Sequence, residues 1–213
     1  MSSVEKSFID AICSSKPWLL AKNWGHIRPG HPEGSVGRHV TEQLLPFVDK
    51  WYKNDVDYWD LVALCYLHDI GKPVTEYSDG RLSGEPHSVI SARIAADLGA
   101  PDRLVQVILA NDRTYSHWRK LKDKTGAWSA ARWTPERREK FRQEFGRSGL
   151  DLRLLVLFHR ADNAYRRRVD RDESIDYVRW FENRIVEERL IASLPEAGRD
   201  QRFEWPASLN IGF

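Results

Sequence analysis

The sequence has little cysteine and no long apolar run, and both absences exclude classes of protein. Only two of its 213 residues are cysteines, too few for the disulfide framework of a small secreted protein. Cys65 lies inside an apolar segment, as expected of a reduced, buried cysteine in the cytosol. No segment approaches the roughly 20 apolar residues of a membrane-spanning helix, and the N-terminus does not resemble a signal peptide. We therefore expect a soluble, cytoplasmic protein that does not bind membranes.

A strong net charge is also missing. The formal net charge is +2, which gives no general indication of binding to nucleic acid. The exception is residues 113–147, with eleven Lys or Arg against four Asp or Glu and three interleaved tryptophans. This composition predicts either a solvated helical insertion with a few anchoring aromatic residues, or a lid for a ligand that carries a phosphate and a base. The basic run at 166–171 would extend that surface if it lies nearby.

Alternating strand patterns are absent, and apolar residues recur at helical spacing instead. The pattern predicts helices over about 35–52, 58–70, 87–99, 100–112, 151–168 and 173–194. The second of these is apolar on nearly every face, which predicts a central buried helix. Pro46 would bend the final turns of the first. Without repeats or low-complexity segments, the sequence predicts a single all-α domain over residues 1–213, a helical bundle with residues 113–147 as an insertion.

The most apolar segment, "LVALCYLHDIGKP" at residues 61–73, ends in a histidine and an aspartate. Burying two titratable groups is costly unless hydrogen bonds or a metal ion satisfy them. Consecutive helical residues point in different directions, but His68 and Asp69 can converge on one ion at the end of a helix. His39 and Asp162, which lie on other apolar helix faces, are the candidates for two further ligands. Two histidines and two carboxylates suit Mn, Ni, Co, Fe, Zn or Mg.

The set of His39, His68, Asp69 and Asp162 resembles the signature of the HD-domain superfamily of metal-dependent phosphohydrolases. The stretches "HPEGSVGRHV", "LHDIGKP" and "GEPHSVISARIAADLG" are similar to the HD domain at the C-terminal end of some bacterial tRNA nucleotidyltransferases (CCA-adding enzymes). The resemblance extends over about residues 31–163. It implies an all-α bundle in which the four residues ligate one divalent metal. A nucleotidyltransferase head is absent, so nucleotide addition is not implied.

The sequence departs from the HD families that hold two metals. Those families usually have a histidine after the helix that corresponds to residues 100–112, where this sequence has Asn111 and Asp112. We therefore expect one metal, with Asp112 as a candidate ligand of a second ion and a candidate substrate contact. His87 matches the histidine that follows the HD helix in the family. It could ligate a second ion or bind the substrate phosphate.

The resemblance implies hydrolysis at phosphorus. A divalent ion lowers the pKa of bound water from about 15.7 towards about 7, which provides the nucleophile. We expect Asp69, Lys72 and His87 to be the catalytic residues, with Lys72 contacting a phosphate oxygen and His87 donating to the leaving group. Lys72 and His87, together with Asn163 and Arg166, are also expected to bind the substrate.

Each of these residues has a structural alternative. Hydrogen bonds at the helix end would explain the His68–Asp69 pair, His39 could be a core histidine, and Asp162 could pair with Arg160 or Arg166. Glu33 either shapes the turn that enters the first metal helix or borders the pocket. Three further histidines are expected in packing or surface positions: His26, His117 and His159.

Three functions fit these residues. The first is a phosphomonoesterase or 2′,3′-cyclic phosphodiesterase acting on nucleotides or RNA ends. The second is a nucleoside triphosphate hydrolase. The third is a non-catalytic RNA-binding module in which the metal is structural.

Overall fold

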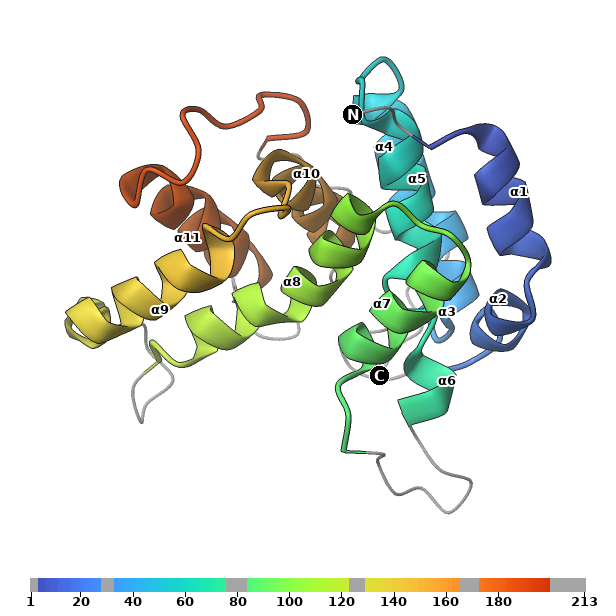
Figure 1. Cartoon of the computed structure of the whole chain (residues 1–213), viewed down its shortest axis with the longest axis horizontal. Helices are drawn as coiled ribbons and strands as arrows, with labels where there is room; N and C mark the ends of the chain where they lie inside the picture. Colours follow the sequence, from blue (N-terminus) through green and yellow to red (C-terminus); the bar gives the residue numbers. More distant parts are fainter. Residues whose placement is uncertain (1–3, 28–32, 76–83, 123–128, 165–172, 200–213) are drawn as a thin grey trace.

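The computed structural model describes residues 4–27, 33–75, 84–122, 129–164 and 173–199. Within these ranges the chain is built of helices joined by turns and short loops (Figure 1), so the predicted all-α fold is confirmed. None of the helices in these ranges has the length and apolarity that crossing a bilayer requires. Cys65 is buried and forms no disulfide, as predicted.

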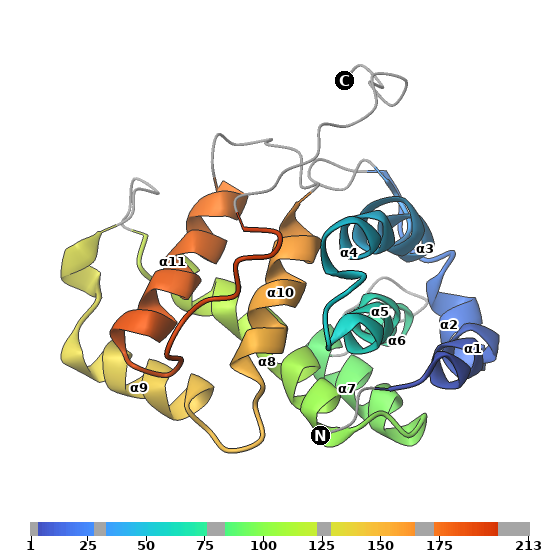
Figure 2. The same cartoon turned by 90° about the horizontal axis from the view of Figure 1, so that it is seen from above.

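The helices fall along the chain in two groups. The first group is α1 (Lys6–Ser14), α2 (Lys16–Ala21), α3 (Val36–Arg38), the π-helix η1 (His39–Leu44), α4 (Leu45–Tyr52), α5 (Tyr58–Leu67), α6 (Lys72–Thr75) and α7 (His87–Asp97). The second is α8 (Asp102–Arg119), the 3-10 helix η2 (Ala130–Arg132), α9 (Pro135–Phe145), α10 (Leu152–Asn163) and α11 (Glu173–Glu187). Figures 1 and 2 place α1 to α7 at one end of the molecule and α9 and α11 at the other, with α8 reaching into both.

Helix α5 is the central buried helix that the sequence predicts. Its residues Leu61 to Cys65 and Leu67 are all buried, and it packs against α1, α4, α7, α8 and α10. Each fully buried leucine or valine side chain contributes about 1.5–3 kcal/mol to folding through the hydrophobic effect. The helix ends at Leu67 with His68 as its C-cap, so the histidine–aspartate pair lies at the end of the most apolar element.

The helix predicted over 35–52 is not a single α-helix. Its middle, His39–Leu44, is a π-helix, in which the Leu45 N–H donates to the carbonyl oxygen of Val40. Pro46 follows at the start of α4. A proline has no N–H for the carbonyl four residues earlier and its ring clashes with that carbonyl, and a wider turn accommodates it. The helix therefore changes its winding just before Pro46, in the segment that carries His39.

Several predicted helix ends are wrong, and the helices expected to reach residues 70 and 168 end at Leu67 and Asn163. The helix expected to stop at residue 112 continues as α8 to Arg119, because buried residues such as Ile108, Thr114 and Trp118 extend its inward-facing stripe. The helix expected to reach residue 194 ends at Glu187. Arg189 has a positive φ of 58°, and a left-handed residue terminates a helix.

The described parts of this basic segment, residues 113–122 and 129–147, pack into the fold, and their aromatic side chains face inward. Trp133 and Phe141 make edge contacts with Trp180 of α11, at ring-centroid distances of 5.6 and 5.7 Å. Phe145 packs against Phe181 at 5.0 Å. Both views place α9 at the end of the molecule away from α6. These aromatic residues belong to the hydrophobic core or pack against it, as anchoring residues of a helical segment do.

Candidate metal centre

The His68–Asp69 pair is buried where α5 ends. The exposed fractions of the two residues are 3% and 4%. His68 Nδ1 lies 3.2 Å from the carbonyl oxygen of Leu64 and 3.1 Å from that of Cys65, and because carbonyl oxygens only accept, this nitrogen carries the hydrogen. The lone pair of His68 is therefore on Nε2. That atom is fully buried and makes no well-aligned hydrogen bond to the described residues, although Asp69 Oδ2 lies 3.2 Å away.

His39 and Asp162 lie against this pair. His39 Nε2 is 3.0 Å from Asp162 Oδ1, and His68 Nε2 is 3.8 Å from the same oxygen. Ligand atoms of His39, His68 and Asp69 all lie within 4.8 Å of one another. The structure thus brings together the four residues that the sequence selects as ligands, from η1, the end of α5 and α10.

Two residues behind His39 determine which of its nitrogens faces the cluster. His39 Nδ1 lies 2.9 Å from Gln43 Oε1, and Gln43 Nε2 donates to Glu33 Oε2 at 3.2 Å. All three residues are buried. Since the Gln43 Nε2 group is the donor to Glu33, its Oε1 accepts from His39 Nδ1–H, so Nε2 is the ring nitrogen that faces Asp162 and is placed to bind a metal ion. Metal-ligating histidines usually donate their second ring N–H in this way.

The donor set fits a divalent metal. Burial lowers the pKa of His68, but the negative charges of Asp69 and Asp162 raise it, and the net shift is upward. Burial alone would raise the pKa of Asp69, but His68 and Lys72 hold it well below its usual range. The cluster therefore favours a positive charge among its carboxylates. Two imidazole lone pairs and two carboxylates suit a first-row divalent ion, which would also satisfy the buried His68 Nε2.

Lys72 and His87 both reach Asp69, and their predicted contacts with the substrate stay predictions. Lys72 Nζ donates to Asp69 Oδ2. His87 Nε2 lies 3.3 Å from Asp69 Oδ1 and 3.3 Å from Asp112 Oδ2. The close approach of this turn to α7, which carries His87, depends on Gly71, where an added Cβ would lie 2.6 Å from the Ser91 backbone nitrogen. Only a glycine lets the turn after Asp69 lie this close to the first turns of α7.

The remaining predicted contacts lie differently. Asn163 donates through Nδ2 to the carbonyl oxygen of His159 at 2.9 Å and to the Tyr177 hydroxyl at 3.0 Å, so its amide is directed into the core and a substrate contact stays a prediction. Arg160 donates to Glu182 of α11 and to the carbonyl oxygens of Pro195 and Ala197. Asp162 is not the acceptor in any of these three hydrogen bonds. Arg166 lies outside the described residues.

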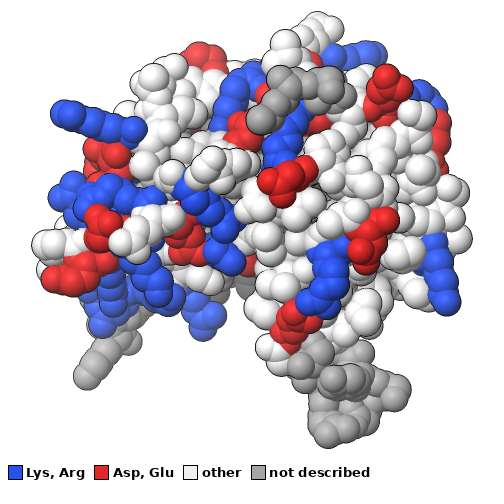
Figure 3. All heavy atoms as spheres, viewed as in Figure 1, with Lys and Arg blue, Asp and Glu red and all other residues white. Residues whose placement is uncertain are grey.

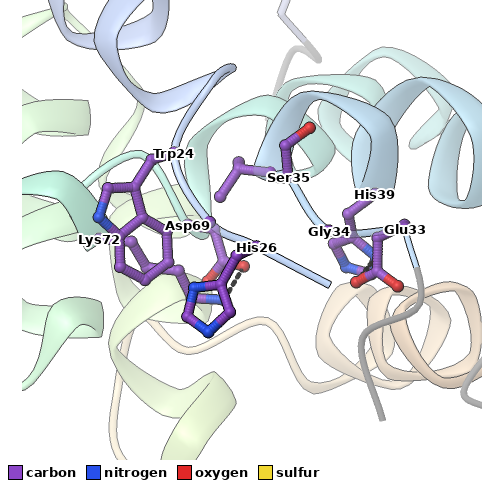
Figure 4. Close-up of a pocket in the computed structure, with 10 residues that line it drawn as sticks. Trp24, His26, Glu33, Gly34, Ser35, His39, Asp69 and Lys72 are labelled. Carbon is purple, nitrogen blue, oxygen red and sulfur yellow. Dashed lines mark hydrogen bonds and ion pairs between the residues drawn. The ribbon is translucent and has the colours of Figure 1, made fainter. Parts of the chain in front are cut away.

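A pocket with about 310 Å³ of empty space opens beside the cluster (Figure 4). Its lining consists of Trp24, Gly25, His26, Glu33, Gly34, Ser35, Val36, His39, Asp69 and Lys72. Glu33 borders the pocket, which was one of its two predicted roles, whereas His26 lines it and is not merely a surface residue. Sequence reasoning did not find Trp24 or Gln43. The signal for Gln43 was its position four residues after His39 on a helix.

His117 and His159 are packing residues, as predicted. His117 is buried and bonds to Glu144 Oε2 through Nε2 at 2.5 Å. His159 is fully buried and packs against the rings of Tyr177 and Phe181.

Comparison with protein families finds a match to the HD domain. The model of the HD domain matches residues 39–191, a range that begins at the first proposed ligand and includes the other three. No curated protein matched the sequence, and no solved structure did.

Proposed function

The chain belongs to the HD domain family, whose members are generally metal-dependent phosphohydrolases, and from this premise we propose that it hydrolyses phosphate esters of nucleotides or RNA ends. The observation that carries the proposal is the fully buried His68 Nε2, which faces two carboxylates and makes no well-aligned hydrogen bond to the described residues. A buried polar atom in this position is costly unless a ligand satisfies it.

The proposed metal ligands are His39, His68, Asp69 and Asp162. When bound, a divalent ion supplies an activated water near neutral pH and neutralises charge on the phosphoryl oxygens. The chain's own residues hold this geometry in advance. The hydrogen bonds from His68 Nδ1 to backbone carbonyls and from His39 Nδ1 to Gln43 fix both imidazole rings.

Lys72 and His87 are proposed to act on the substrate. The Lys72 side chain is 18% exposed and lies where the pocket meets Asp69, so its ammonium group can move from Asp69 to a phosphate oxygen. The His87 side chain is 29% exposed and its Nε2 already points at Asp69 and Asp112. In this arrangement His87 donates a proton to the leaving oxygen, and Asp112 orients its ring.

Two observations favour esters of nucleotides or RNA ends over the alternatives. The stretches "HPEGSVGRHV" and "LHDIGKP" resemble the HD domain of tRNA nucleotidyltransferases, which favours 2′-phosphates and 2′,3′-cyclic phosphates over triphosphates. The basic surface over α9 and the end of α8 (Figure 3) is partly neutralised within the fold. Arg138 and Arg142 pair with Glu188, and Arg113 pairs with Glu144. An RNA-binding module would need these cations for phosphates.

The test is phosphate release from 2′-, 3′-, 5′- and 2′,3′-cyclic nucleotides and from triphosphates with Mn²⁺, Ni²⁺, Co²⁺ or Mg²⁺. We expect chelator-sensitive hydrolysis of a 2′- or 2′,3′-cyclic ester. His68→Ala and Asp69→Asn should each lower kcat/KM by on the order of 10³-fold, because the metal contributes several kcal/mol to transition-state stabilisation.

The matched control is Asp97→Asn, which changes an exposed carboxylate at the end of α7 and should keep full activity. Unchanged hydrolysis by both ligand variants would show that the reaction occurs elsewhere. Preferred hydrolysis of triphosphates would support a nucleoside triphosphate hydrolase. Salt-dependent RNA binding without hydrolysis would support a non-catalytic RNA-binding module.

A further inference from the structure

The pocket beside the metal centre is framed by two segments that run side by side, 24–27 and 33–37. The Val36 N–H donates to the carbonyl oxygen of Trp24 at 3.0 Å, and the Gly37 N–H donates to that of Lys22 at 2.9 Å. Gly25 and Gly34 have φ angles of +112° and +80°, and a Cβ on Gly25 would lie 2.4 Å from the Gly34 carbonyl oxygen. The two segments approach this closely only because these residues are glycines, so the pocket is formed before any ligand binds.

The walls of this pocket differ in chemistry. Figure 4 shows Trp24 and Lys72 on one side and Glu33 beside His39 on the other. The Lys72 ammonium attracts a phosphate, as would a divalent ion held by the four proposed ligands. Glu33 does not attract a phosphate, because its carboxyl oxygens, like those of the phosphate, act as hydrogen-bond acceptors. It is 5% exposed and held by Gln43 Nε2. A ligand that satisfies both walls carries a phosphate at one point and an N–H or O–H donor at another.

Trp24 adds an aromatic face to this arrangement. Its indole is half-buried and lines the pocket, and nucleobases stack on such rings whatever their identity. One indole face stacks one base, so this wall of the pocket suits a single nucleoside rather than a folded nucleic acid.

We propose that this pocket binds the nucleoside part of the substrate, with the base stacked on Trp24 and a nucleoside N–H or O–H group donating to Glu33. The proposal rests on the proposed function, since the phosphate of the same nucleotide would lie at the metal centre. It makes Trp24 and Glu33 specificity-determining residues, a role that neither the HD signature nor the helical pattern indicates.

The test uses ribonucleosides, which have no phosphate to hydrolyse. The full-length protein, labelled with ¹⁵N and supplied with Mg²⁺, is titrated with adenosine, guanosine, cytidine or uridine, and with ribose as the baseless control. The Trp24 indole signal, identified by its loss in Trp24→Leu, should shift with at least one nucleoside and not with ribose. The Gly34 amide signal, present in every variant, should report a Kd about tenfold weaker in Trp24→Leu.

Three further variants complete this experiment. Trp24→Phe keeps an aromatic face and should retain most of the affinity. Glu33→Gln, which presents a donor as well as an acceptor, should weaken binding. Trp59→Leu changes another half-buried tryptophan that does not line this pocket and should bind normally. Equal shifts with ribose and nucleosides, the absence of any nucleoside shift, or normal affinity in both Trp24→Leu and Glu33→Gln would overturn the proposal.

The two proposals can fail separately. Nucleoside binding by a protein that hydrolyses no phosphate ester would retain the pocket assignment and remove the proposed function. Hydrolysis of nucleotides by a protein that binds no nucleoside would do the opposite.

Discussion

The two ends of helix α5 both bury carboxylates, but they neutralise them differently. At the start of the helix, Asp60 is fully buried, accepts from the Val4 N–H at 2.9 Å and pairs with Arg103. Its neighbour Asp57 pairs with Arg153. At the end of the helix, Asp69 has imidazole neighbours and the partly exposed Lys72.

This difference separates a structural cluster from a functional one. Guanidinium groups are charged at every relevant pH and match carboxylates with fixed geometry, so the first end of α5 is neutralised by the chain itself. At the second end, the imidazoles present lone pairs and a pocket gives access to Asp69. A buried carboxylate thus indicates a metal site only where its neighbours are potential ligands and a ligand can enter.

The largest expected effect on stability is at the structural end. Arg103→Met leaves Asp60 buried without its cation, which should lower the free energy of unfolding by about 3–5 kcal/mol. Urea denaturation measures this. Arg93→Met, which removes an exposed partner of Glu85, should leave the stability unchanged. A stable Arg103→Met protein would show that Asp60 is neutral in the fold, and the contrast between the two ends would disappear.

The second-largest expected effect is stabilisation of the fold by metal binding at the end of α5 that carries His68 and Asp69. Metal at about 100 times its Kd should raise the free energy of unfolding by about 2.7 kcal/mol, and a chelator should remove this gain. Asp69→Asn should abolish the metal-dependent gain. Arg103→Met should keep it, because Arg103 contacts carboxylates at the other end of α5. Equal loss of the gain in both variants would mean that the two ends are not independent.

A smaller effect, on metal affinity, is expected at Gln43, which contacts the proposed ligand His39. Gln43→Leu removes the acceptor that orients His39 and should weaken metal binding by about 10- to 100-fold, measured by competition with a chelating dye. Gln143→Leu is the matched control, since Gln143 also contacts a residue four positions earlier, Glu139, but on the exposed face of α9. Metal affinity that is normal in Gln43→Leu would exclude a positioning role for Gln43.

The sequence was sufficient to find the four candidate ligands because each interrupts an apolar helical stripe. His68 and Asp69 end the most apolar segment, and Asp162 lies on a helix that is otherwise almost wholly buried. A carboxylate in such a position needs a partner wherever the helices pack. The helices themselves were predictable for the same reason, since their buried faces recur at regular spacing.

The pocket was not predictable in this way. Trp24 lines the pocket because two irregular segments approach each other at Gly25 and Gly34, and backbone contacts of this kind leave no periodic pattern in the sequence. Gln43 is one polar residue among several on its helix. The inward packing of Trp133 and Phe141 depends on α11, which comes later in the chain. Composition alone therefore could not distinguish an anchored helical insertion from a ligand-binding lid.

The smallest expected effect lies at the far end of the molecule, in the contact between α8 and α9. The pKa of Glu144 is lowered chiefly by its hydrogen bond from His117, with burial opposing and Arg113 assisting. A carboxylate with a lowered pKa stabilises the fold at pH values above its ordinary pKa, about 4.3. This contribution is lost as the pH falls through the lowered pKa.

Glu144→Gln should therefore be less stable than the wild type at pH 7, by about 1 kcal/mol or less. The difference should shrink as the pH falls below about 4, as urea denaturation at several pH values would show. Because this pair lies apart from the metal centre, the same difference should be measured with and without chelator, and a difference that depended on metal would couple the two ends of the molecule.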